Sequence, residues 1–172
     1  MRKTLIVIDM QNDFIDGSLG TYEAKLIVPK VRKKIDEYIE RGDRVIYTRD
    51  THFANYLDTN EGKHLPVRHC IMHTPGWWIH RDVLRKDADC DIVDKNTFGY
   101  IRWDEFYRFD DDVELVGLCT DICVVSNALI LKAMFPEIEI TVDASCCAGT
   151  TYHNHNAAIQ TMKSCQINII GE

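Results

Sequence analysis

The sequence predicts an α/β fold built on a central, mainly parallel sheet of about six strands. Two observations indicate this class. Short β-rich runs alternate with segments of helical periodicity, and most of those runs are continuously apolar, as in strands that helices cover on both faces. Such alternation is typical of repeated β-α-β units. The six expected strands are Thr4–Ile8, Arg44–Thr48, Asp91–Val93, Val113–Gly117, Glu139–Val142 and Ile167–Ile170.

Three helices are expected between these strands. The first repeats apolar residues at helical spacing and ends at Gly42, because glycine is a favourable C-terminal cap. The second follows Cys123 and ends before Pro136, and the third lies around Asn156–Ser164. The periodic positions of the first helix are Val31, Ile35, Tyr38 and Ile39.

Length and composition favour a single domain, residues 1–172, in which 45% hydrophobic residues supply a sizeable core. The net charge of −7 leaves no basic excess for nucleic acid. The apolar stretch Leu5–Ile8 is too short for a signal peptide, and nothing approaches a membrane span. Seven cysteines without a C-x-x-C pair indicate neither a disulfide framework nor a cysteine zinc site. The cytoplasm is therefore the expected location.

Reactive side chains follow four of the expected strands. In parallel sheets, ligands bind beyond the carboxyl ends of the strands. Asp9 follows the first strand, Asp50 and His52 the second, Lys95 the third, and the turn Cys119–Cys123 the fourth. Singly, these are compatible with ordinary turn residues, a solvated lysine and a small core cysteine. Their joint placement predicts that Asp9 and Lys95 meet the cysteine turn in one crevice.

The chemistry of this trio supports a nucleophile at Cys123. A helix N-terminus and a nearby ammonium group such as Lys95 raise the thiolate fraction of a cysteine. Asp9 alone would disfavour a second anion, so it is better interpreted as the group that takes the thiol proton and hands it to the leaving group. The positive charge of Lys95 balances the negative charge shared by Asp9 and Cys123.

Three segments resemble the motifs of the isochorismatase-like cysteine hydrolases. They are Ile6-Val-Ile-Asp9-Met-Gln-Asn-Asp13-Phe14, Asp94-Lys95-Asn-Thr-Phe98-Gly99 and Gly117-Leu-Cys-Thr-Asp-Ile-Cys123-Val. The resemblance covers nearly the whole chain in the right order. It implies a three-layer, Rossmann-like fold and an Asp-Lys-Cys triad at Asp9, Lys95 and Cys123. It also implies an oxyanion hole from the backbone amides of Cys119 and Cys123, and a cis peptide bond between Leu118 and Cys119.

Within that family the chain is most similar to the nicotinamidases. This implies that the enzyme hydrolyses a small carboxamide, and specifically that it converts nicotinamide to nicotinate and ammonia through a Cys123 thioester. The small-molecule amide is then its expected binding partner. One alternative is a related hydrolase of another small amide, carbamoyl or vinyl-ether substrate. Another is a redox sensor that uses Cys123 with Cys119. The resemblance is also compatible with a homo-oligomer.

A second cluster, Asp50, His52, Glu61 and His69, combines carboxylate and imidazole groups, which are suitable ligands for zinc, iron or manganese. Alone, this spacing is a weak motif, and surface polar residues of a long loop are the structural alternative. The resemblance to nicotinamidases implies a metal site in this segment, with zinc as the expected ion. It leaves the fourth ligand as glutamate or histidine, and we expect Glu61 rather than His64.

Phe14, Leu65 and Phe98 are expected to line the substrate pocket. The resemblance places Phe14 on the substrate ring, whereas Leu65 stands where nicotinamidases often have a tryptophan. Trp77 or Trp78 would replace that aromatic wall, although both are equally compatible with core positions.

Overall fold

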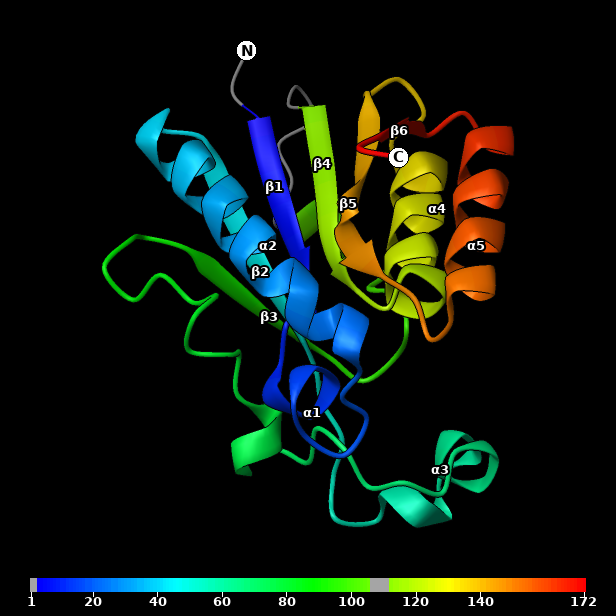
Figure 1. Ribbon diagram of the computed structural model, residues 1–172. Coiled ribbons are helices and arrows are strands. Elements are labelled where there is room, and N and C mark those ends of the chain that lie inside the picture. The colour runs from blue at the N-terminus through cyan, green and yellow to red at the C-terminus, as the bar shows by residue number, and fades with distance from the viewer. Residues whose placement is uncertain (1–2, 106–111) are drawn as a thin grey trace.

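One parallel sheet forms the centre of the fold. The computed structural model describes residues 3–105 and 112–172, where six strands pair in the order β3-β2-β1-β4-β5-β6 (Figure 1). Every neighbouring pair is parallel. The expected α/β class is therefore confirmed. The strands are β1 (Lys3–Ile8), β2 (Arg44–Asp50), β3 (Asp91–Lys95), β4 (Asp112–Leu118), β5 (Ile140–Ala148) and β6 (Asn168–Ile170).

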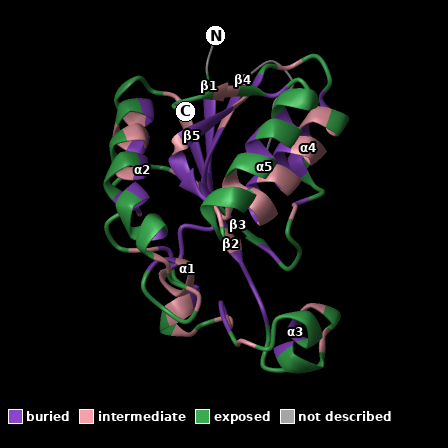
Figure 2. Ribbon diagram, turned by 45° about the vertical axis from the view of Figure 1, so that its right-hand side comes forward, coloured by how far each residue is buried: buried purple, intermediate pink, exposed green. Residues whose placement is uncertain are grey.

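Helices cover both faces of the sheet and make a three-layer structure, with α2 on one face and α4 and α5 on the other (Figure 1). Side chains of a strand point alternately to its two faces. Leu5 and Val7 accordingly pack in the core beneath α2, and Ile6 and Ile8 in the core beneath α4 and α5. Figure 2 shows the buried sheet between helices with exposed outer faces. The helices are α1 (Asn12–Ile15), α2 (Tyr22–Glu40), α3 (Asn60–His64), α4 (Val125–Met134) and α5 (Tyr152–Ser164).

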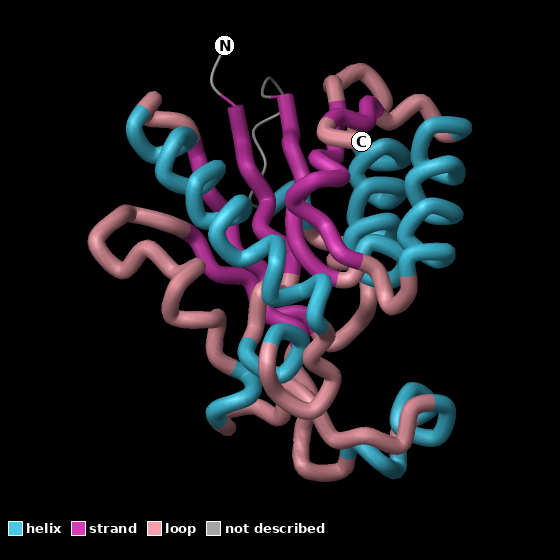
Figure 3. The backbone as a smooth tube through the Cα atoms, viewed as in Figure 1, coloured by secondary structure: helices cyan, strands magenta, loops and turns pink. Residues whose placement is uncertain are grey.

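The long connections gather with α1 and α3 at the carboxyl ends of the strands (Figure 3). The connection between β2 and β3 is attached there by two isolated backbone bridges, His52 with Ile71 and Gln11 with Ile79. This is the end of a parallel sheet where ligands bind. The topology therefore gathers the residues that follow β1, β2, β3 and β4 on one side of the molecule.

Strand β5 runs to Ala148, well beyond its expected end at Val142. Asp143 interrupts the apolar run, so hydropathy predicts an early end. In the structure, Asp143 Oδ2 lies 2.7 Å from the Nζ atom of Lys34 on α2, and the same ammonium group pairs with Glu114 on β4. This pairing allows a carboxylate to occupy a buried strand position.

The charges of this cluster stabilise one another. Burial raises the pKa of Asp143, but hydrogen bonds from Lys34 and Ser145 outweigh it and lower the pKa below its ordinary value. Burial likewise lowers the pKa of Lys34, but the carboxylates of Asp143 and Glu114 outweigh it and hold the pKa above its ordinary value. These ion pairs join α2 to strands β4 and β5.

Three helices begin at threonine caps, and at the start of α3 the Thr59 side chain accepts the Gly62 amide. The Thr21 side chain accepts the Ala24 amide at the start of α2, and the Thr151 side chain accepts the Asn154 amide at the start of α5. Helix α5 therefore begins earlier than its apolar periodicity predicts. Within residues 3–105 and 112–172, no helix combines the length and apolarity needed to cross a bilayer.

Candidate active site

Asp9, Lys95 and Cys123 meet beyond the sheet. Asp9 follows β1, Lys95 ends β3, and Cys123 lies in a π-helical turn, Thr120–Val124, between β4 and α4. The Lys95 Nζ atom is 2.6 Å from Asp9 Oδ2 and 3.5 Å from Cys123 Sγ. All three residues are buried. One ammonium group thus contacts both the carboxylate and the thiol.

Thr48 on β2 fixes the Asp9 carboxylate, a role the sequence did not reveal. Its hydroxyl donates a 2.6 Å hydrogen bond to Asp9 Oδ1 and accepts one of 3.1 Å from the Asp9 amide. Asp9 itself has a φ of 47°. A threonine in an apolar strand is ordinary, so only the pairing of β1 with β2 identifies this contact.

The electrostatics of the thiol differ from the expectation. Burial raises the pKa of Cys123 well above its ordinary value, and Lys95 offsets only part of this effect. Lys95 thus favours the thiolate, as expected, but burial has the larger effect on the pKa of Cys123. Burial also raises the pKa of Asp9, although Lys95 opposes it. The thiol needs a base at the moment of attack, and Asp9 is held beside the same lysine.

Burial acts on Cys119 in the same direction as on Cys123. Burial raises the pKa of Cys119 to about 12. A redox-sensing thiol needs a low pKa and access to oxidant. The structure therefore disfavours the sensor alternative for this pair of cysteines.

The turn that contains Cys123 is hydrogen-bonded to helix α5. The peptide bond between Leu118 and Cys119 is cis, as the resemblance implied. The buried Thr120 hydroxyl lies 2.8 Å from His155 Nδ1 on α5. That the backbone amides of Cys119 and Cys123 form an oxyanion hole remains a prediction.

Asn127 on α4 joins this turn to the loop after β3. Its Oδ1 atom accepts the Tyr100 amide at 2.9 Å and the Trp103 indole N–H at 3.2 Å. Its Nδ2 atom donates to the carbonyls of Cys123 at 2.8 Å and Phe98 at 3.1 Å. One buried amide therefore fixes both the segment of the nucleophile and the segment of Phe98. The apolar character of the surrounding sequence did not predict this role.

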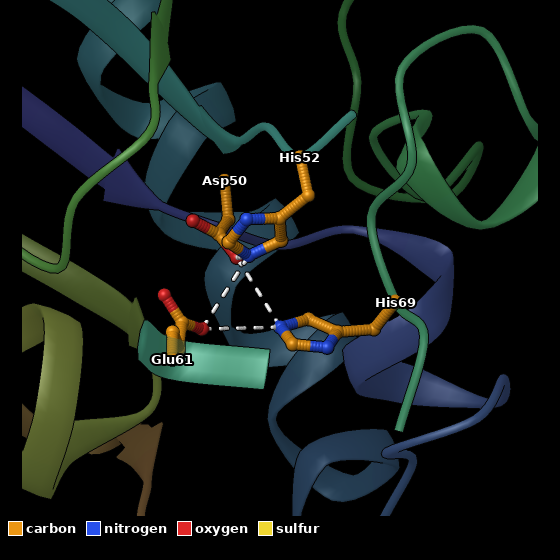
Figure 4. A group of neighbouring side chains, drawn as sticks. All are labelled: Asp50, His52, Glu61 and His69. Carbon is orange, nitrogen blue, oxygen red and sulfur yellow. Dashed lines mark ion pairs between the residues drawn. The ribbon is translucent and has the colours of Figure 1, made fainter. Parts of the chain in front are cut away.

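Four side chains converge beside the triad, as Figure 4 shows. Asp50 ends β2, His52 follows it, Glu61 lies on α3 and His69 comes from the loop beyond. One ligand atom from each lies within 4.8 Å of the others. The Nε2 atom of His52 is 2.9 Å from Asp50 Oδ2 and 3.4 Å from Glu61 Oε1, and that of His69 is 3.5 Å and 3.7 Å from the same oxygens.

Two features show that this cluster fits a divalent metal. The buried Nε2 atom of His52 makes no hydrogen bond despite its short distance to Asp50, so its ring is aimed at a shared point rather than at the oxygen. His69 Nδ1 donates to the Val67 carbonyl at 2.8 Å, and this hydrogen bond orients the ring with its Nε2 atom toward the cluster. His64 lies outside the cluster, with Nδ1 2.8 Å from the Asn60 carbonyl.

Opposite charges stabilise His52 and Asp50 within this cluster. Burial lowers the pKa of His52, but Asp50 and Glu61 outweigh it and raise the pKa to about 9. Burial raises the pKa of Asp50, but the two histidines and Lys95 outweigh it and lower the pKa. A metal cation would replace the proton on the imidazole.

Gln11 and Lys95 connect the cluster to the triad. The buried Gln11 amide accepts the Asp50 N–H at 2.7 Å and donates to the Asp50 carbonyl at 2.8 Å. The Lys95 Nζ atom lies 3.6 Å from Asp50 Oδ1. Gln11 lies within the first motif, but the sequence alone did not predict that it positions Asp50.

A cavity of about 950 Å³ opens onto both groups. Cys119 and Cys123 contribute to its wall, as do the expected pocket residues Phe14, Leu65 and Phe98. The wall also contains the four residues of the metal cluster. Thus the nucleophile and the candidate metal centre share one chamber.

The tryptophans do not replace an aromatic wall. Neither Trp77 nor Trp78 lines the cavity. Trp77 is a core residue whose indole N–H donates to Thr51 Oγ1 at 2.8 Å, and Trp78 is exposed elsewhere. Arg49 stacks on the Trp77 ring at 3.7 Å from its centroid. Local composition cannot distinguish such a core tryptophan from a pocket tryptophan.

Comparison with known proteins defines the class. The model of the isochorismatase domain family matches residues 3–171. The nicotinamidase/pyrazinamidase of Mycobacterium tuberculosis is 26% identical over 191 residues, which cover 98% of each chain. The pyrazinamidase of Pyrococcus horikoshii in complex with zinc superimposes with a TM-score of 0.83 and 27% identity, covering 100% of both chains. The N-carbamoylsarcosine amidase of Thermoplasma acidophilum gives a TM-score of 0.85 and 26% identity, covering 99% of this chain and 96% of that one.

The chain therefore belongs to the isochorismatase family. It is an enzyme of this hydrolase family and is similar over almost its full length to nicotinamidases. The expected family and the three-layer fold are both confirmed.

Proposed function

We propose that this enzyme is a metal-containing nicotinamidase that converts nicotinamide to nicotinate and ammonia through a thioester on Cys123. The observation that carries the proposal is Lys95. Its ammonium group contacts Asp9, Cys123 and the metal-cluster residue Asp50 within one buried site. An amidase needs both a thiol with a proton acceptor and a means of orienting the amide, and this lysine joins the two.

The charge of the cavity favours a neutral amide. Among the described residues, its wall contains no arginine or lysine, and its carboxylates belong to the metal cluster. Away from the metal cluster and Lys95, a carboxylate substituent would therefore meet no arginine or lysine side chain on this wall. This favours a ring carboxamide over acidic carbamoyl or vinyl-ether substrates.

Acylation begins with the thiol. Asp9 takes the proton as Cys123 Sγ forms a bond to the carboxamide carbon, while Lys95 neutralises the carboxylate and the developing thiolate. The amide nitrogen then takes the proton from Asp9, and the C–N bond breaks to release ammonia. Hydrogen bonds from backbone amides of the Cys119–Cys123 turn stabilise the oxyanion.

Water completes the reaction. Asp9 accepts a proton from the water that attacks the thioester carbonyl, and Cys123 leaves and regains a proton. The products are the free acid and the starting enzyme. Asp50, His52, Glu61 and His69 would hold a divalent metal, which when bound would supply a Lewis acid beside the substrate.

The first test measures ammonia release from nicotinamide. The purified protein and a Cys147→Ala control, which changes a buried cysteine outside the cavity, are expected to release ammonia, and Cys123→Ala is expected to release none. Elemental analysis is expected to find about one metal ion per chain. Absence of ammonia from the metal-loaded protein would contradict the nicotinamidase proposal.

The similarity to an N-carbamoylsarcosine amidase supports one alternative, an amidase for carbamoyl compounds. The same assay with an N-carbamoyl amino acid separates the two functions. Faster ammonia release from that substrate than from nicotinamide would favour the alternative and overturn the charge argument.

A further inference from the structure

Three large apolar side chains remain exposed at the cavity. Phe53 is 53% exposed, Phe98 47% and Leu65 37%, and all three line the chamber that contains Cys123. They come from three different segments, the loop after β2, the loop after β3 and the residue after α3. Their convergence on one cavity differs from the scattered exposed apolar residues of an ordinary surface.

The backbone at each of the three positions is fixed. The Phe53 carbonyl accepts the Tyr56 amide at 3.0 Å, and the Leu65 carbonyl accepts the Tyr56 hydroxyl at 2.9 Å. The Phe98 carbonyl accepts the Asn127 amide at 3.1 Å. Each of the three residues therefore has a hydrogen-bonded backbone carbonyl, while its apolar side chain is partly exposed to solvent. Such preorganised surface lowers the entropic cost of binding an apolar group.

The size of the chamber indicates what that group is. A volume of about 950 Å³ lies at the upper end of the roughly 300–1,000 Å³ typical of pockets for drug-sized ligands. A single ring with one carboxamide fills only a small part of such a volume. Outside the metal cluster, the lining includes neutral polar side chains such as Asn55, Asn96 and Thr97.

We propose that Phe53, Leu65 and Phe98 form a second, apolar subsite, and that the preferred substrate is a neutral ring carboxamide with an apolar substituent. This inference rests on the proposed amidase function of Cys123. The carboxamide reaches the nucleophile at the base of the chamber, and the substituent covers the three side chains at the opening. A concave wall shared with the nucleophile favours a part of the substrate as the occupant over a second copy of the chain.

The test uses nicotinamide and its 5-alkyl derivatives from methyl to butyl. Binding to the Cys123→Ala variant is measured by calorimetry, and kcat/KM of the active protein by ammonia release. We expect affinity and kcat/KM to rise about fourfold per methylene, the factor that corresponds to ~0.8 kcal/mol per buried CH₂. Equal affinity across the series would overturn the subsite.

A matched pair of variants locates the effect. Phe53→Ser is expected to reduce the ratio of butyl to parent affinity at least tenfold. Leu57→Ser, which changes another exposed apolar residue that does not line the cavity, is expected to leave the ratio unchanged. Equal ratios in both variants would overturn the assignment to Phe53.

The failure of each proposal has its own signature. Length-dependent binding without ammonia from any compound would support the subsite and contradict the amidase function. Ammonia release from nicotinamide with no gain along the series would support the amidase and overturn the subsite. Light scattering that shows a dimer lost on Phe53→Ser, together with a flat series, would identify the apolar surface as an interface between copies.

Discussion

Replacing Asn127 by leucine should destabilise the protein strongly, because this change keeps the approximate volume but removes all four hydrogen bonds. The Trp103 indole N–H and the Tyr100 amide, both in buried residues, lose the Oδ1 acceptor. A buried donor left without its acceptor costs about 1–3 kcal/mol. The stranded indole N–H contributes about 1–3 kcal/mol, and the loss of the other hydrogen bonds contributes about 1 kcal/mol more, so the expected loss of stability is about 2–4 kcal/mol.

Urea denaturation followed by tryptophan fluorescence measures this loss. With an m value of about 2 kcal/mol/M, a loss of about 2–4 kcal/mol lowers the urea midpoint by roughly 1–2 M. Ser126→Ala is the matched control, since Ser126 is the preceding residue on α4 and its hydroxyl donates to the Ile122 carbonyl. Its expected loss is below about 1 kcal/mol. If Asn127→Leu lost no more than this control, the role given to the buried amide would be refuted.

Three further changes test the triad, the metal cluster and the charge cluster. Thr48→Val should lower kcat at least about tenfold without unfolding the protein, because the Asp9 carboxylate loses the hydroxyl that positions it. Thr48→Ser keeps a hydroxyl and should retain most of the wild-type kcat. Equal kcat values for the wild type and both variants would contradict this role. Glu61→Gln should lower the bound metal measured by elemental analysis, whereas His64→Gln should not, and equal metal content in both would refute the ligand assignment. Lys34→Met should destabilise the protein by about 3 kcal/mol near pH 7. Because the folded pKa of Asp143 is lowered, this difference should shrink as the pH falls below about 4, and a constant difference in acid denaturation profiles would contradict the pairing.

The fold was largely predictable because its strands are continuous apolar runs. The exceptions arise where a long-range contact changes the local pattern. Asp143 ends the apolar run of β5 in the sequence, and only Lys34, brought from α2, makes its strand position favourable. Thr151 likewise begins α5 before any apolar periodicity is visible.

The chemistry-bearing residues of the candidate site were predictable from their positions after strands, but their supporting contacts were not. Thr48 meets Asp9, and Gln11 meets Asp50, through pairs that are each 39 residues apart in sequence. Such contacts depend on strand register, which the sequence does not specify locally. The net direction of the Cys123 pKa shift was not predictable, because burial, the largest influence on that pKa, is a property of the whole fold.

The choice between Glu61 and His64 shows the same limit at short range. The two residues are three positions apart on α3 and share one helical face, so spacing favours neither. The structure distinguishes them, because Glu61 Oε1 lies 3.4 Å from His52 Nε2 whereas His64 is outside the group of converging ligand atoms.

The central claim is the covalent intermediate on Cys123. Its most direct test is rapid acid quenching of the enzyme during turnover of nicotinamide, followed by peptide mass spectrometry. The account predicts a nicotinoyl group on the peptide that contains Cys123, formed as ammonia is released and lost as nicotinate appears. Ammonia release at full rate with Cys123 unmodified at every time point, or from the Cys123→Ala variant, would contradict the account.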